Sequence, residues 1–228
     1  MKRSFIREIL ESIDENTISF AGGLPSENLF PKEDLKTAAV KIFDNPKAFQ
    51  YGLSNGIPEL REKIASRYTK EGFPTAKENI LITTGSQQAM YILAKFYESK
   101  DITIEEPSYL GAMNIFRLNH LKMHGIKLEK DGINIKDFKE SFKNTKLTYL
   151  IPDFQNPSAT TYCDEKRKEI AKIVSEENGI LIEDSPYSEL FFDKKNISIS
   201  SKIPKNSFYL GSFYKTLVPS LRFGWFRA

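Results

Sequence analysis

The sequence predicts an α/β fold, a three-layer sandwich in which helices cover both faces of a mostly parallel central sheet. From residue 79 onward, short apolar runs alternate with longer amphipathic segments, the order expected of repeated β-α-β units. The apolar runs are nearly continuous, which is typical of parallel strands buried on both faces. With 228 residues, 40% of them hydrophobic and 28% charged, the chain has globular composition and sufficient length for a large core.

The first part of the chain, before residue 79, lacks this alternation of strands and helices. Helical spacing of apolar residues predicts an amphipathic first helix, on Phe5, Ile6, Ile9, Leu10 and Ile13. A Gly/Pro-rich segment follows over residues 20–31, and a helix is expected over residues 32–43. Another helix should begin at Pro58, a residue favoured in the first helical turn. We expect residues 1–45 to form an N-terminal arm with helices and residues 46–228 to form the main domain.

The alternating region supplies the sheet and its covering helices. Strands are predicted at residues 79–84, 102–106, 125–130, 147–154, 179–184, 207–213 and 223–228. Helices are predicted at residues 85–97, 111–121, 133–142 and 164–178, the last ending at Gly179.

Composition excludes several classes of protein. The net charge of +3 is too small to favour a nucleic-acid groove or an anionic membrane partner. No stretch approaches the roughly 18 apolar residues of a membrane helix, and the charged N-terminus lacks the apolar block of a signal peptide. We therefore expect a cytoplasmic protein with no nucleic-acid and no membrane partner.

Metal and nucleotide sites are also disfavoured. The single cysteine, Cys163, excludes an intrachain disulfide and a multi-thiolate metal site. His120 and His124 are spaced as a possible zinc pair, but no third ligand accompanies them, so surface histidines at a helix end are the better interpretation. Neither the glycine-rich dinucleotide motif nor the P-loop motif is present. We expect no metal site.

Ligands of such sheets bind beyond the carboxyl ends of the strands, so residues just after the strands are the candidates. Gly85 follows the strand predicted at residues 79–84 and allows a tight turn. Ser86 and Gln87 then present amides at a helix start, a ready site for an anion such as phosphate. Ser86 could equally be a simple N-cap.

Three more polar residues follow the next strands. Asn156 precedes Pro157 after a long apolar run, where it could act in a site or simply initiate a turn. Asp184 ends a buried strand and Tyr187 follows it. A carboxylate there could cap a turn, or it could hold a proton on a heterocyclic nitrogen.

The last strand-end segment contains Ser212, Lys215 and Arg222. A partly desolvated lysine has a lowered pKa and can attack carbonyl groups as a nucleophile. Arg222 could hold a phosphate with two parallel hydrogen bonds. The alternative is a solvated turn with a basic rim.

Taken together, these segments form an ordered series of motifs: GGLP, Y-G-x-x-x-G, GSQQA, PSYLGA, P-x-x-QNP, EDSPY and GSF-x-K-T-L-x-P-x-L-R. The series, from about Ser19 to the last residue, resembles fold type I pyridoxal-phosphate enzymes. Within them it resembles the class I/II aminotransferases near the 2-aminoadipate and aromatic aminotransferase-like group. The resemblance implies that pyridoxal 5'-phosphate is the cofactor, that an amino acid and a 2-oxo acid are the substrates, and that the protein is a homodimer. It also implies that residues 46–228 are the cofactor-binding large domain.

The resemblance assigns catalytic roles to Lys215, Asp184 and Tyr109. Lys215 matches the lysine that forms the internal aldimine and then moves the substrate proton. Asp184 matches the carboxylate that keeps the pyridine nitrogen protonated, and Tyr109 matches the ring stacked on the cofactor. Asn156 and Tyr187 match the donors to its phenolic oxygen.

Further positions match binding residues. Tyr51 matches a tyrosine that reaches the phosphate of the neighbouring subunit. Gly23 matches the loop glycine beside the bound substrate, and the resemblance implies that Asn156 also contacts the substrate. The residues that match the phosphate cup are Gly85, Ser86, Gln87, Ser212 and Arg222.

The sequence departs from the pattern in two respects. Many relatives have a small hydroxyl residue before the lysine, where this chain has Tyr214, which either removes a phosphate contact or replaces it. The chain also stops at Ala228, so we expect the small C-terminal domain, with the arginine for the substrate carboxylate, to be largely missing. The alternatives are another pyridoxal-phosphate reaction such as β-elimination, an inactive truncated fragment, or the sensing domain of a transcriptional regulator.

Overall fold

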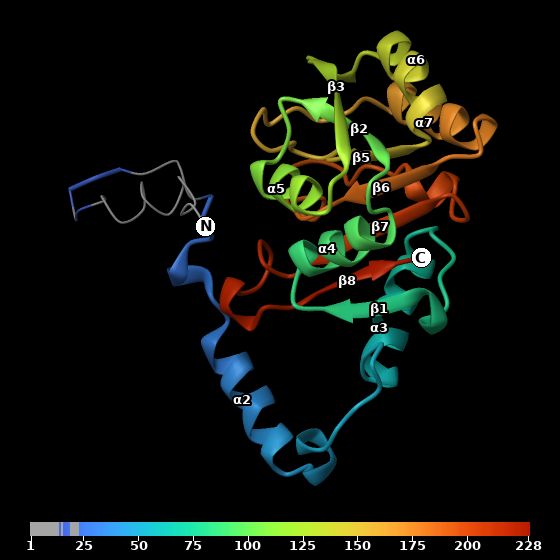
Figure 1. Ribbon diagram of the computed structural model, residues 1–228. Coiled ribbons are helices and arrows are strands. Elements are labelled where there is room, and N and C mark those ends of the chain that lie inside the picture. Colours follow the sequence, from blue (N-terminus) through green and yellow to red (C-terminus); the bar gives the residue numbers. More distant parts are fainter. Residues whose placement is uncertain (1–13, 15, 19–22) are drawn as a thin grey trace.

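In the part of the chain that the structure describes, one eight-stranded sheet forms the centre (Figure 1). The computed structural model describes residues 14, 16–18 and 23–228, so the predicted first helix and Gly22 of the GGLP motif lie outside the described residues. The strands are β1 (Ile80–Thr83), β2 (Asp101–Glu106), β3 (Lys122–Glu129), β4 (Gly132–Ile133), β5 (Leu147–Leu150), β6 (Ile180–Asp184), β7 (Ser207–Ser212) and β8 (Gly224–Arg227).

The strand order is β1-β8-β7-β6-β5-β2-β3-β4. Strands β3, β2, β5, β6 and β7 are parallel to their neighbours in this series, while β8 is antiparallel to both β7 and β1. Strand β1 therefore runs in the same direction as β7, and β4 forms an antiparallel edge with β3. The prediction of a mostly parallel α/β sheet is confirmed.

Helices cover the two faces of the sheet, as predicted. Tyr149 and Ile182 point into one core cluster with α4 (Ser86–Phe96) and α5 (Leu110–Leu118). Their strand neighbours Leu150 and Leu181 point into a second cluster with α6 (Ile135–Thr145) and α7 (Asp164–Glu176). Because successive side chains of a strand alternate between faces, the two clusters lie on opposite sides. A third cluster joins α3 (Pro58–Lys70) to the β1–β8 edge.

Two predicted boundaries are wrong for identifiable reasons. The run over residues 147–154 leaves the strand after Leu150 because the amide of Ile151 donates to the buried carboxylate of Glu105, 3.0 Å away. The helix predicted from residue 133 begins at residue 135, where the side chain of Asn134 caps it by accepting from the amide of Asp137. Residue 133 belongs to strand β4 instead.

Two further details of the structure differ from the sequence-based expectation. Strand β3 begins earlier than predicted and includes His124, which pairs with Asp101 at 2.9 Å and is not at a helix end. After α7, Asn178 adopts the left-handed conformation that is common at helix ends, and Gly179 does not. Glycine is required at position 179 because the Phe142 side chain leaves no room for a Cβ, which would lie 2.6 Å from Cε1 of Phe142.

Residues 23–57 form an extension that projects away from the sheet (Figure 1). It contains η1 (Glu27–Leu29), α2 (Lys32–Phe43) and η2 (Pro46–Phe49), and the bounds of α2 match the prediction. None of the residues from 23 to 60, all of which the structure describes, is buried. Among the described helices, none has the length and apolar character that a membrane span requires.

Candidate active site

The loops that carry the predicted residues meet at one edge of the sheet. Asn156 and Lys215 lie after the carboxyl ends of the parallel strands β5 and β7, and Asp184 is the last residue of β6. Strand β1 runs in the same direction, so the start of α4 lies at this edge too. The register of β8 places Gly224 opposite both Thr83 and Ser212, which brings the β1 and β7 ends together. Strand order reverses between β2 and β5, the position where sheets of this kind bind ligands.

Asp184 provides a buried negative charge. Its side chain is 2% exposed, and Oδ2 accepts a hydrogen bond of 2.7 Å from the hydroxyl of Tyr149. The other oxygen, Oδ1, has no hydrogen-bond partner among the described residues. Burial raises the pKa of Asp184 to about 6, and the hydrogen bond from Tyr149 opposes this rise. A buried carboxylate with one unpaired oxygen is stabilised by a positively charged N–H group that donates to that oxygen.

Lys215 is a half-buried amine in contact with the extension. Its Nζ donates to the carbonyl of Gly23 at 2.7 Å and lies 5.6 Å from the ring centroid of Tyr187. Burial lowers the pKa of Lys215, which favours the neutral amine that can attack a carbonyl carbon. Burial raises the pKa of the Tyr187 phenol, and hydrogen bonding with Asn156 opposes that rise. The structure thus brings Gly23, Asn156, Tyr187 and Lys215 together.

Tyr109 joins the site from the loop after β2. Its hydroxyl accepts a 3.0 Å hydrogen bond from Nε2 of Gln87 at the start of α4. Burial raises the pKa of Tyr109, and the charge of Asp184 raises it further. The hydroxyl of Tyr109 therefore links the loop after β2 to the start of α4.

The predicted phosphate residues Gly85, Ser86 and Gln87 lie at the start of α4. Gly85 is the N-cap residue with φ of +113°, a conformation that glycine adopts without strain, so Ser86 is the first helical residue and not the N-cap. The first amides of a helix have no acceptor within it, and the helix dipole favours an anion there. At the same edge, the buried hydroxyl of Ser212 has no hydrogen-bond partner among the described residues. Arg222 follows η5 (Pro219–Leu221) and is exposed.

Sequence reasoning missed two residues behind the site. Tyr149, on strand β5, donates a hydrogen bond to Asp184. The one sequence feature that could have pointed to it is the presence of a tyrosine within the otherwise mostly aliphatic strand. Glu105, which is 1% exposed, accepts hydrogen bonds from three groups that build the loop of Asn156. The donors are the amide of Ile151 at 3.0 Å, Nε2 of Gln155 at 3.0 Å and the hydroxyl of Tyr162 at 2.7 Å. Burial raises the pKa of Glu105 to about 7.

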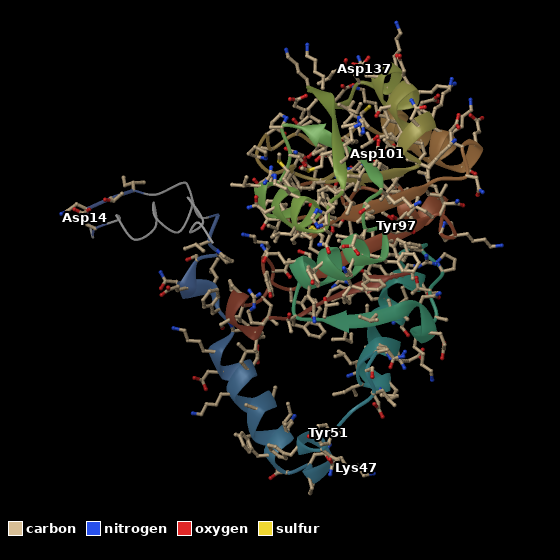
Figure 2. All side chains as sticks on the ribbon, viewed as in Figure 1. Asp14, Lys47, Tyr51, Tyr97, Asp101 and Asp137 are labelled. Atoms are coloured by element: carbon tan, nitrogen blue, oxygen red, sulfur yellow. The ribbon has the colours of Figure 1, made fainter. Side chains whose placement is uncertain are left out.

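Tyr51 is the one predicted site residue that the structure places elsewhere. It is fully exposed at the far end of the extension, close to Lys47 and away from the sheet (Figure 2). Its predicted contact with a neighbouring subunit stays a prediction. Within the described part of the chain, no group of three or more histidine, cysteine, aspartate or glutamate side chains could hold a metal ion.

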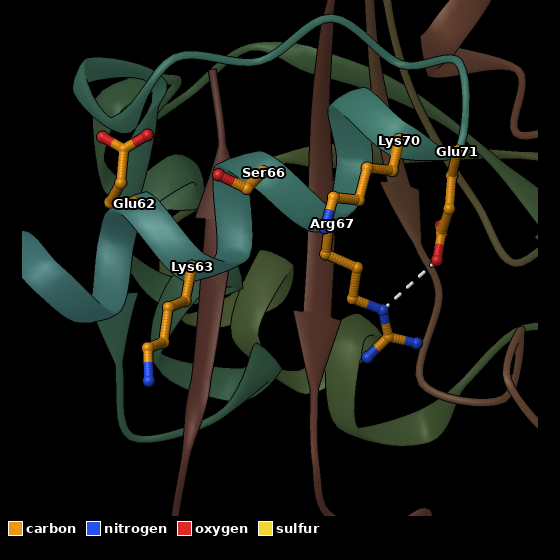
Figure 3. Close-up of a pocket in the computed structure, with 6 residues that line it drawn as sticks. All are labelled: Glu62, Lys63, Ser66, Arg67, Lys70 and Glu71. Atoms are coloured by element: carbon orange, nitrogen blue, oxygen red, sulfur yellow. Dashed lines mark hydrogen bonds and ion pairs between the residues drawn. The ribbon is translucent and has the colours of Figure 1, made fainter.

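A shallow pocket on α3 lies outside this site. Figure 3 shows its charged side chains, among them Arg67, which pairs with Glu71 at 3.2 Å. None of the predicted site residues lines the pocket. Exposed ion pairs of this kind contribute little free energy, and we interpret the surface as a solvated helix face.

Comparison with known proteins agrees with the geometry. The profile of the family "Aminotransferase class I and II" matches residues 16–226. The chain is 34% identical to the 2-aminoadipate transaminase of Thermus thermophilus, with 97% of this chain and 58% of the relative covered. It is 32% identical to aromatic-amino-acid aminotransferase 1 of Thermococcus litoralis, with 100% and 58% covered. Proteins described as HTH-type transcriptional regulators also match, at 28–30% identity.

A solved structure gives the same picture. The Pyrococcus horikoshii kynurenine aminotransferase, solved in complex with PMP, superposes with a TM-score of 0.89 at 33% identity. The match covers 99% of this chain and 59% of that chain, so this chain spans less than two thirds of the length of these relatives. The profile match, together with the shared fold, shows that the chain belongs to the class I and II aminotransferase family.

Proposed function

We propose that this protein is a pyridoxal-phosphate-dependent aminotransferase that moves an amino group between an amino acid and a 2-oxo acid. One observation carries the proposal: a half-buried amine, Lys215, lies at the same sheet edge as the buried, half-satisfied carboxylate of Asp184. An amine of lowered pKa is suited to covalent capture of an aldehyde. A buried carboxylate with one free oxygen is suited to a protonated ring nitrogen.

The residues present fit pyridoxal phosphate at each of its functional groups. The free oxygen of Asp184 and the unpartnered hydroxyl of Ser212 are buried polar atoms that a ligand would satisfy. The phosphate would be held at the start of α4, with Arg222 as the cation. Asn156 and Tyr187 would hold the phenolic oxygen, and Tyr109 would cover the ring. The chemistry that this cofactor supplies when bound is withdrawal of electrons from the substrate Cα.

The chain's own groups have separate tasks in this chemistry. The amine of Lys215 would hold the cofactor through its aldehyde and would move the proton at the substrate Cα. The carboxylate of Asp184 would keep the ring nitrogen protonated. The hydroxyl of Tyr149 fixes the orientation of that carboxylate from within the sheet. Gly23, whose carbonyl accepts a hydrogen bond from Lys215, would lie beside the bound substrate.

A lysine comparison tests the proposal. The purified protein, supplied with pyridoxal phosphate, an amino acid and a 2-oxo acid, is expected to form the new amino acid. Lys215→Ala should abolish this transfer, whereas Lys172→Ala, which removes an exposed lysine on α7, should leave it unchanged. Equal turnover in both variants would refute the role of Lys215. Release of ammonia and pyruvate without amino transfer would instead indicate β-elimination.

We further propose that two copies of the chain associate through the extension. Helix α2 has no buried residue, and Val40, Ile42 and Phe43 are each more than half exposed. Exposed apolar side chains in such number mark an interaction surface. A two-fold dimer would also give Tyr51 a role at the partner's phosphate. Light scattering should show a dimer, and Phe43→Ser should shift the equilibrium toward the monomer. A protein that is monomeric at every concentration tested would contradict this proposal.

The boundary at residue 45 between the N-terminal arm and the main domain stays a prediction.

A further inference from the structure

Tyr214, directly before Lys215, occupies the phosphate end of the site. Its hydroxyl donates a hydrogen bond to the carbonyl of Thr84, one residue before the N-cap of α4. A phenol has one O–H hydrogen to donate. Because that hydrogen is directed to Thr84, the hydroxyl has no hydrogen left for a phosphate oxygen.

The ring of Tyr214 lies against Gly85. An added Cβ at Gly85 would lie 2.6 Å from Cζ of Tyr214 and 3.0 Å from Cε2, closer than real Cβ contacts allow. The ring therefore occupies space that exists because residue 85 has no side chain. Anchored at Thr84 and packed on Gly85, the ring has a fixed position beside the helix start.

The outer face of this ring holds Arg222. The guanidinium carbon lies 4.8 Å from the ring centroid, within the range of a cation–π contact. Arg222 is otherwise an exposed side chain on a loop, with φ of +51°. A free arginine loses rotamer entropy when it binds an anion, and a side chain already held against a ring loses less.

We propose that Tyr214 is a positioning residue that holds Arg222 ready for the phosphate group of the cofactor, and is not itself a phosphate donor. The inference rests on the proposed function, because it assumes a phosphorylated cofactor at this edge. In this chain the anchored phenol takes the place of the small hydroxyl residue that the resemblance leads us to expect. It acts through the arginine and not through its own oxygen.

The test measures affinity for pyridoxal phosphate and for pyridoxal, which lacks the phosphate, by titrating the cofactor absorbance. Tyr214→Ala should raise the Kd for pyridoxal phosphate about two- to fivefold, the effect of losing an exposed cation–π contact. The Kd for pyridoxal should stay the same, which also shows that the variant is folded. Tyr214→Phe keeps the ring and should retain most of the affinity for pyridoxal phosphate.

A double-mutant cycle with Arg222→Gln makes the test sharper. If Tyr214 acts through the arginine, Tyr214→Ala should add no further loss in the Arg222→Gln background. Additive losses would overturn the inference. So would a Tyr214→Phe protein that is as weak as Tyr214→Ala and whose loss adds to that of Arg222→Gln, because the hydroxyl would then act independently of the arginine, as a direct donor. Failure of the proposed function is a different result: the unmodified protein would bind neither pyridoxal phosphate nor pyridoxal at Lys215.

Discussion

The two ends of the candidate site are built differently. At the end expected to hold the cofactor ring, Asp184, Tyr149 and Glu105 are each at most 2% exposed and come from three neighbouring strands. At the end expected to hold the phosphate, Arg222 is exposed and Tyr214 is only partly covered, and both lie on the segment between β7 and β8. The first end is fixed by the sheet, and the second depends on contacts between loops.

This difference decides where charge has most effect. At the buried end, the carboxylates of Asp184 and Glu105 are removed from water. The loss of hydration disfavours their charged form and raises the pKa of both. In the exposed end, water and salt weaken each ionic contact. We therefore expect the largest changes in function from the buried end and smaller, salt-sensitive changes from the exposed end.

Removal of the buried charge should have the largest effect. Asp184→Asn preserves the shape of the side chain but removes its charge, and kcat/KM for amino transfer should fall by about 10²–10³-fold, as for other preorganised groups that stabilise charge. Tyr149→Phe is the matched control, because it removes only the hydrogen bond to Asp184 and should reduce the rate much less. An Asp184→Asn protein with the rate of the unmodified protein would show that the ring end is not functional.

A glycine comparison probes the phosphate end. Gly85 and Gly72 both have positive φ, of +113° and +83°, but an added Cβ meets Tyr214 at Gly85 and nothing within 4 Å at Gly72. Gly85→Ala should lower the free energy of unfolding by about 1–3 kcal/mol more than Gly72→Ala, the usual effect of overpacking. Urea unfolding measures both. Equal losses would mean that the ring of Tyr214 is not fixed against Gly85.

The buried end should also give the protein a pH-dependent stability. The pKa of Glu105 is raised from 4.5 to about 7, so the folded state binds its proton more tightly than the unfolded state does. Its contribution is full below pH 4.5 and is lost as the pH rises to 7. The free energy of unfolding should fall by on the order of 3 kcal/mol across this window, at about 1.4 kcal/mol for each unit of the pKa difference. Asp184 adds a change of the same sign between its ordinary value of 3.8 and about 6.

Glu105→Gln isolates this contribution, because glutamine does not titrate. Urea unfolding at several pH values should show a smaller decrease for the variant than for the unmodified protein. A parallel decrease in the two proteins would place the titrating group elsewhere.

The smallest effect should be that of salt. Raising the ionic strength from about 0.1 to 1 M shortens the Debye length from about 10 to about 3 Å. Affinity for pyridoxal phosphate should fall a few-fold, because we expect its phosphate to bind at the exposed end. Affinity for pyridoxal should barely change. Equal salt dependence for the two compounds would remove the distinction between the ends.

Much of the sheet, and the strand ends at which Gly85 and Lys215 lie, could be predicted from the sequence. Glycine at a helix start and a lysine just after an apolar strand are local patterns, and Gly85 and Lys215 were found in this way. The buried partners were not found, because they depend on pairing between distant strands. Tyr149 reaches Asp184 over 35 residues of chain, and Glu105 binds Gln155 over 50. The anchor of Tyr214 at Thr84, 130 residues away, was invisible for the same reason.

The central claim is that Lys215 binds the cofactor covalently, and chemical trapping tests it most directly. The protein is mixed with pyridoxal phosphate, reduced with borohydride and digested, and the modified peptide is located by mass spectrometry. The structure predicts one pyridoxyl group on Lys215, because burial lowers the pKa of its amine at the edge that carries Asp184. A label that is spread over exposed lysines such as Lys172, or that is absent from Lys215, would contradict the account.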